Sequence, residues 1–234
     1  MSAVKAVTMN PTTALRRAQV YSFLAGAFLY PVENWTEDVP LAAEIVAALG
    51  FVQASLNVEP LALEQLRDAH RVAFGVTGSL CYETEYGLPH EFRQSQELAD
   101  ISGFYRAFGF VVGNSVRERP DHLAVELEFM QVLALKEAYA AGSGSVAHVE
   151  ICVEAQRRFL HDHLGGWIGL FAQGLALNAE GVYLALAEFT AAYVLADAAR
   201  LGVTLAPRNL RDVRHTPPGP SLSCGECSLA QVSE

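Results

Sequence analysis

The sequence has very little lysine and more acid than base. Lys5 and Lys136 are the only two lysines among 234 residues. Lys and Arg together number 16 against 26 acidic residues, so 16 − 26 leaves a formal net charge of −10. A protein that follows nucleic-acid phosphates needs a basic face. The charge balance therefore argues against nucleic acid as a partner and permits a partner that carries positive charge.

Long apolar runs are also missing. No uninterrupted apolar stretch reaches the roughly 18–20 residues that cross a membrane. The nearest approach to a signal peptide is residues 18–30, directly after Arg16 and Arg17. Polar residues interrupt that stretch, and its apolar positions recur at the spacing of a core-facing helix. We interpret this stretch as the first helix of the fold. We expect a cytoplasmic protein that has no membrane span and whose cysteines are thiols.

Motifs of the common nucleotide-dependent and hydrolytic enzymes do not occur. The chain contains no GxxxxGK[ST], no GxGxxG and no G-x-S-x-G. A di-iron carboxylate bundle requires Glu-x-x-His on two helices, and none of the seven histidines has a glutamate at that spacing. The sequence therefore gives no support to an ATPase, a dehydrogenase, a nucleophilic hydrolase or a di-iron enzyme, and we expect no resident cofactor.

Helical periodicity, in contrast, extends over most of the chain. Hydrophobic residues make up 51% and charged residues 18%, which suits a large hydrophobic core. The pattern predicts an all-α, single-domain helical bundle over residues 10–205. The expected helices span residues 12–29, 38–49, 59–74, 94–108, 121–139, 146–163, 167–177 and 180–201. Residues 206–234, rich in Pro, Ser and Gly, are predicted to form a flexible C-terminal tail.

The predicted tail carries Cys224 and Cys227 in a Cys-x-x-Cys arrangement, which redox and zinc sites use. A closed zinc site needs two further ligands from elsewhere in the chain. His161 and His163 do not form a shared metal site on one helix, because positions i and i+2 face apart. A small helical metal-binding or redox protein that uses the C-terminal cysteines remains the alternative function.

Residues 119–130 are the least ordinary stretch. On a helical wheel their apolar side chains fall on two opposite sides, which predicts a helix packed between neighbours. The first half of this helix also carries four polar side chains: Asp121, His122, Glu126 and Glu128. Such groups are rarely buried unless they are paired. Residues 83–137 hold ten acids and five bases, half of the net negative charge. One interpretation is an acidic, partly enclosed groove for a cationic ligand.

A purely structural interpretation stays open for the same residues. Asp121 follows Pro120 and precedes a helix, so it is a good candidate for the N-cap. His122 and Glu126 have the spacing of an ordinary i, i+4 pair. Under this interpretation the polar side chains stabilise the helix and bind nothing.

The same stretch resembles the signature of the TorD/DmsD/NarJ family of molybdoenzyme maturation chaperones, in which a linker leads into a Pro-Asp-His-containing helix with following acids. Residues 81–87 (CYETEYG), 101–109 (ISGFYRAFG) and 156–164 (QRRFLHDHL) also look like this family. The likeness covers about residues 14–200. It is nearest to the branch that serves type II enzymes of the dimethyl sulfoxide reductase family: dimethyl sulfide dehydrogenase, ethylbenzene dehydrogenase, and selenate or chlorate reductases.

The resemblance implies a TorD-like helical fold and a cytoplasmic, system-specific chaperone that is not an enzyme. Such a chaperone binds the precursor of an exported molybdoenzyme catalytic subunit, at its twin-arginine leader, its mature body or both. It assists insertion of the molybdenum cofactor and delays export. Molybdenum cofactor biosynthesis proteins are further candidate partners. Monomer and homodimer both remain open.

Carried onto this chain, the resemblance places the client-binding region at the linker 111–120 and the start of the following helix. Carboxylates suit guanidinium groups, and Met and aromatic side chains suit an apolar helix. The candidate client-binding residues are Asp121, His122, Glu126, Glu128, Tyr86, Phe104, Tyr105 and Met130. The aromatic residues and Met130 are equally open to interpretation as plain core. No metal site is expected; Cys224 and Cys227 are weak candidate ligands, which Cys81, Cys152 or His215 could join only if the tail folds back.

Overall fold

A computed structural model describes most of the chain: residues 10–51, 54–75, 81–86, 91–113, 118–177 and 179–205, with the side chains of residues 91–93 excepted. These residues form eight α-helices and two short 3₁₀ helices, and no strand longer than an isolated bridge occurs among them. The elements are α1 (Pro11–Ala27), η1 (Trp35–Asp38), α2 (Val39–Ala48), α3 (Leu63–Phe74), η2 (Glu83–Tyr86), α4 (Glu91–Ala107), α5 (Leu123–Gly142), α6 (Val146–Asp162), α7 (Leu164–Ala176) and α8 (Val182–Arg200). The predicted all-α class is confirmed. The predicted tail, 206–234, lies outside the described residues.

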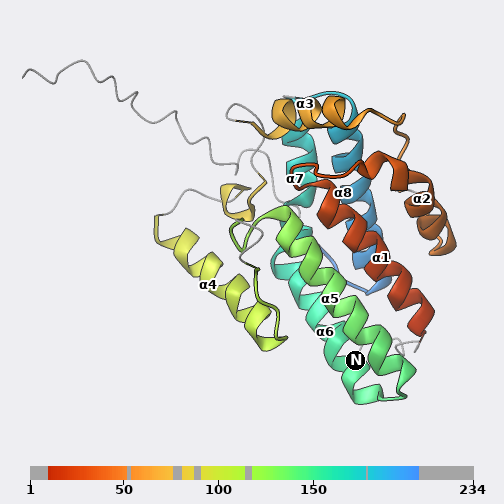
Figure 1. Cartoon of the computed structure of the whole chain (residues 1–234). Helices are drawn as coiled ribbons and strands as arrows, with labels where there is room; N and C mark the ends of the chain where they lie inside the picture. Colours follow the sequence, from red (N-terminus) through yellow and green to blue (C-terminus); the bar gives the residue numbers. More distant parts are fainter. Residues whose placement is uncertain are drawn as a thin grey trace, which may run out of the picture.

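The helices form a bundle in which α1 runs along α5, α5 packs on α6, and α7 packs on α8 (Figure 1). α3 contacts α8 near one end of the bundle, and α4 lies at the side, where its main backbone neighbour is η2. α7 follows α6 almost without a break, because His163 alone leaves helical geometry between them (φ −124°, ψ −104°). The predicted gap before residue 167 is therefore absent.

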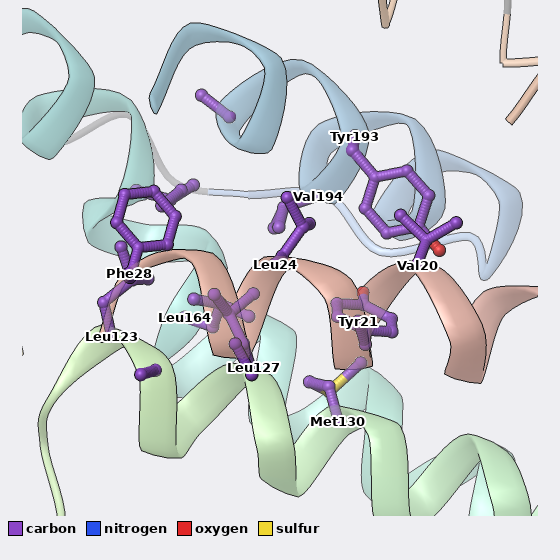
Figure 2. Close-up of a cluster of buried hydrophobic side chains, with 14 of the residues drawn as sticks. Val20, Tyr21, Leu24, Phe28, Leu123, Leu127, Met130, Leu164, Tyr193 and Val194 are labelled. Carbon is purple, nitrogen blue, oxygen red and sulfur yellow. The ribbon is translucent and has the colours of Figure 1, made fainter. Parts of the chain in front are cut away.

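The first helix is a core element, as predicted for residues 18–30. Asn10 caps α1 by accepting a hydrogen bond from the Thr13 amide at 3.1 Å, and Pro11 occupies the first turn. Figure 2 shows α1 between α5 and α8, with Leu24 pointing into the cluster that fills this space. The apolar stretch at residues 18–30 is therefore part of the hydrophobic core of the bundle.

α5 is buried on two sides, which confirms the prediction from the helical wheel. Leu127 and Met130 point toward α1 (Figure 2). On the other side, the Phe129 ring lies 4.8 Å from the ring of Tyr105 in α4 and 4.8 Å from that of Phe159 in α6. Because α5 has neighbours on both sides, it is apolar nearly all round.

One helix departs from the expectation of no membrane-spanning segment. α8, Val182–Arg200, is long and apolar enough to cross a membrane by length and composition, but 61% of that window is buried inside the protein. Its apolar character has a direct explanation in the fold. It packs against α7, and its Tyr193 ring makes an edge contact with Tyr21 of α1 at 5.2 Å.

Four helices meet at the fully buried Arg17 of α1. Its Nε and Nη2 donate to the two carboxylate oxygens of Asp197 in α8, at 2.6 and 2.7 Å. Nη1 donates to Glu137 of α5 at 2.8 Å, and Nη2 also donates to Gln156 of α6. Burial alone would raise the pKa of Asp197, but the Arg17 charge, together with hydrogen bonds from Arg17 and Tyr21, holds it below its usual value. The bundle therefore closes around a paired charge, which the sequence did not reveal.

Candidate functional site

Two backbone hydrogen bonds fasten the segment around η2 to the start of α5. The Glu83 amide donates to the Asp121 carbonyl at 2.9 Å, and the Leu123 amide donates to the Cys81 carbonyl at 2.8 Å. We call the side chains gathered at this junction the latch: Tyr82, Thr84, Arg119, Asp121 and His122. The latch places the beginning of α5 beside a segment about 40 positions earlier in the sequence.

Asp121 is fully buried at the centre of the latch. Arg119 grips its carboxylate with two hydrogen bonds, from Nε at 2.9 Å and from Nη2 at 2.6 Å. The Thr84 hydroxyl donates to the same carboxylate at 2.8 Å. Arg119 also stacks over the Tyr82 ring, 4.5 Å from its centroid. Asp121 was predicted to bind a guanidinium group of a partner. In the structure its carboxylate already binds the guanidinium group of Arg119 in the same chain.

His122, and not Asp121, caps α5. The His122 Nδ1 accepts a hydrogen bond from the Ala124 amide at 3.1 Å, and its ring makes an edge contact with Tyr82 at 5.2 Å. The expectation that Asp121 is the N-cap is wrong, because its side chain turns toward Arg119 instead. The His122 carbonyl accepts a backbone hydrogen bond from the Glu126 amide at 3.0 Å, and Glu118 lies 3.9 Å from the His122 Nε2.

Burial is the main reason that the pKa of His122 is lowered; Glu118 and Asp121 oppose this shift without reversing it. In the unfolded chain this histidine is protonated with a pKa near 6.5. In the folded protein its pKa is lower, so it is protonated only at a lower pH. The contribution of His122 therefore reduces stability as the pH falls below about 6.5. His122→Asn keeps a capping side chain but cannot titrate. Urea titrations at pH 7 and at pH 5 give the free energy of unfolding of both proteins. Between these pH values we expect this free energy to fall less for the His122→Asn variant than for the unaltered protein. Equal pH slopes would contradict this.

Glu126 faces the interior, not a groove. It is fully buried, and the Trp167 Nε1 of α7 donates to its Oε2 at 3.1 Å. The Tyr86 ring lies 5.3 Å from the Trp167 ring, and burial raises the pKa of the Tyr86 phenol, which stays protonated. Trp167 was not predicted as a partner; the 41 positions between it and Glu126 give no local spacing signal.

The remaining predicted residues separate into core and surface. Met130 is core, as its place in Figure 2 shows. Tyr105 is also buried, and its hydroxyl donates to the Pro120 carbonyl at 2.7 Å, so it fixes the end of the linker. Glu128 is exposed, and Phe104 is half-buried. The eight predicted residues thus do not share one surface.

A hollow lies between α4 and α6, beside these positions. Its volume is about 810 Å³, and apolar side chains line most of it. Phe104 and Phe108 line it from α4, and Ile151, 55% exposed, from α6. Acidic Asp100, Glu150 and Glu154 and basic Arg158 complete its lining. The sequence did not predict this α4–α6 groove, because it depends on how two helices about 50 residues apart are placed.

Among the described residues we find no candidate site for metal binding or for cysteine chemistry. They contain no group of three or more His, Cys, Asp or Glu side chains placed to hold a metal. Cys81 and Cys152 are free and buried, and burial raises the pKa of both thiols. Cys224 and Cys227 lie outside the described residues. His161 is exposed and His163 buried, so the two face apart as expected.

Comparison with known proteins identifies relatives over most of the chain. A family model described as "Nitrate reductase delta subunit" matches residues 40–173. The chlorate reductase assembly chaperone protein of Ideonella dechloratans is 31% identical over 68% of this chain and 76% of its own. The selenate reductase assembly chaperone protein of Thauera selenatis is 34% identical over 79% and 89%. The perchlorate reductase assembly chaperone protein of Dechloromonas aromatica is 34% identical over 81% and 92%. The resemblance drawn from the sequence is therefore confirmed, and this chain belongs to the TorD/NarJ family.

Proposed function

We propose that this protein is a non-enzymatic assembly chaperone for the catalytic subunit of a molybdenum-containing reductase. The observation that carries the proposal is that three relatives similar over 68–81% of this chain are each named as the assembly chaperone of a reductase. In the finer form of the proposal, the client is a precursor with a twin-arginine leader, bound in the cytoplasm by the domain of residues 10–205 while the molybdenum cofactor is inserted. Such a role needs a surface for a polypeptide and no reacting group.

The α4–α6 groove suits a polypeptide client. An apolar hollow with charged residues at its edges matches an amphipathic helix that buries one face. Phe104 lines this hollow, and Glu128 is exposed, so both are open to direct contact in this conformation. In the proposal, Asp121 and His122 act indirectly by holding residues 118–120 and the start of α5 in place. Glu126, Tyr86, Tyr105 and Met130 hold the elements behind it.

The test uses one exposed residue of the groove. Ile151→Lys places a charge in the hollow without disturbing the core, so we expect affinity for the catalytic subunit encoded beside this gene to fall at least tenfold, or about 1.4 kcal/mol. Leu195→Lys is the matched control, since Leu195 is 47% exposed on α8. Co-purification and titration calorimetry with the precursor measure both variants. Equal binding by both would reject the groove, and failure of the unaltered chaperone to bind any form of the subunit would reject the function.

A further inference from the structure

A second groove lies between α1 and α2, and its volume is about 630 Å³. We call it the α1–α2 groove. Val20, Trp35 and Ala42 are buried and form its base, while Leu41 on its edge is 58% exposed. α2 and α4 lie on opposite sides of the bundle (Figure 1), so this groove is separate from the α4–α6 groove.

α2 is more apolar than its packing inside the protein requires. Glu44 is the only charged residue among its ten positions. One side of the helix packs on α1. Leu41 and Ile45, one turn apart, lie outside that buried side; Leu41 is exposed, Ile45 is half-buried, and both line the groove. Exposed apolar side chains gathered beside a groove are typical of a surface that binds another molecule.

The charged residues that line the α1–α2 groove are all acidic. Glu33, Glu37 and Asp38 are exposed along it, and none of the described residues in its lining is Lys or Arg. In the sequence, residues 18–66 contain six acids and no lysine or arginine, which gives 0 − 6 = −6. Such a surface repels nucleic acid, anionic lipid headgroups and the same face of a second copy, and it attracts a cationic polypeptide.

The length of the groove suits a short helical segment. Along α1 its lining runs from Gln19 to Gly26. These seven steps correspond to roughly 10 Å, or about two helical turns, at 1.5 Å per residue. An amphipathic helix buries its apolar residues in a groove of this kind and keeps its charged residues at the edge. There, carboxylates bind ammonium or guanidinium groups by charge-assisted hydrogen bonds.

Gly26 leaves the α1 side of the groove open. Glycine within a helix is less favourable than alanine, because it loses more conformational freedom on folding. Apart from the backbone of its own helix, no heavy atom lies within 4 Å of where a Cβ on Gly26 would stand. Packing inside the protein therefore does not require a glycine here. Its missing side chain leaves the α1 backbone accessible from the groove.

We propose that the α1–α2 groove binds a basic, amphipathic helical segment of a partner protein. Apolar side chains of that segment pack against Phe23, Leu41 and Ile45, and its Lys or Arg side chains pair with the three acids of the lining. Binding here does not depend on the client, because the α4–α6 groove lies on the opposite side of the bundle. The protein can therefore hold this partner and the client at the same time.

The test uses a fluorescein-labelled synthetic amphipathic helix of leucine and lysine, added to the Ile151→Lys protein, in which the α4–α6 groove carries a repelling charge. Fluorescence anisotropy should show saturable one-to-one binding that weakens with added salt. Glu33→Gln/Glu37→Gln/Asp38→Asn, made in the same protein, should lower the affinity at least tenfold. The glutamine at position 37 keeps an acceptor for the Asn34 side-chain amide, which donates to Glu37 at 3.1 Å.

Two further variants separate the groove from net charge and from folding. Gly26→Trp fills the groove and should lower the affinity at least tenfold, while the unfolding temperature stays nearly unchanged because the new Cβ enters open space. Glu59→Gln/Glu180→Gln/Glu188→Gln is the matched control, since it removes three charges from exposed positions outside the groove and should preserve the affinity. A helix of leucine and glutamate should not bind. Absence of saturable binding, equal affinities of the two triple variants, or full affinity of the folded Gly26→Trp protein would overturn the proposal.

Discussion

Replacing Arg17 with methionine is expected to lower the free energy of unfolding by about 3–5 kcal/mol, the usual cost of breaking a buried ion pair. Methionine fills most of the space, so the loss is electrostatic. Asp197 and Glu137 then remain buried without the cation that both contact. Urea unfolding followed by circular dichroism measures the change. Arg17→Lys should fall between the two proteins, because an ammonium retains the charge but cannot grip Asp197 with two parallel hydrogen bonds.

Arg16→Met provides the matched control. Arg16 precedes Arg17 in the same helix but is only partly buried, so its replacement should change stability by less than about 0.5 kcal/mol. If Arg17→Met and Arg16→Met destabilised the protein equally, the pairing of Arg17 with α5, α6 and α8 would not be a main source of stability.

Asp121→Ala is expected to lower stability by about 2 kcal/mol and to loosen the attachment of η2 to α5. It removes the two hydrogen bonds from Arg119 and the two from the hydroxyl and amide of Thr84. The cost is smaller than for Arg17, because the Arg119 side chain is 37% exposed and regains water once it is released. Hydrogen exchange at the Thr84 amide, which donates to the Asp121 carboxylate at 3.3 Å, should accelerate along with the loss of stability.

A double-mutant cycle with Arg119→Ala separates the pair from the rest of the latch. The two single changes should cost more in sum than the double change, by about 1 kcal/mol or more. Glu128→Ala, which changes an exposed acid on α5, should have almost no effect. If the two single changes were additive, Arg119 and Asp121 would contribute independently. Their ion pair would then not be what stabilises the latch.

Local patterns predicted the helices well, because their causes are local. The two-sided apolar pattern of residues 123–134 anticipated that α5 is packed between α1 and α4/α6. The helical spacing within residues 18–30 identified a core helix where a charge count alone would favour a leader. Helix boundaries were predicted less accurately where a single residue determines them. α5 begins only after its cap, His122. α7 begins directly after His163, so the expected gap before it is absent.

The candidate site could not be predicted to the same degree, because its contacts join distant segments. Glu126 is paired with Trp167, and Arg17 with Asp197, over separations of 41 and 180 positions. No spacing rule connects such residues before the fold is known. Asp121 was singled out by its neighbourhood, but the fold gives its carboxylate to Arg119, only two positions away. Sequence reasoning therefore located the unusual region and missed how its charges are neutralised.

The position of Arg17 also dictates when the protein can finish folding. Its partner Asp197 is synthesised 180 residues later, which takes a ribosome roughly 10–40 s at about 5–20 residues per second. Until then, burying α1 would leave a guanidinium in the core without its main counter-charge. We therefore expect α1 to be enclosed only after α8 has been synthesised. Because α1, α5, α6 and α8 all contribute to the same cluster, we expect the native core to form late, after all four helices are available.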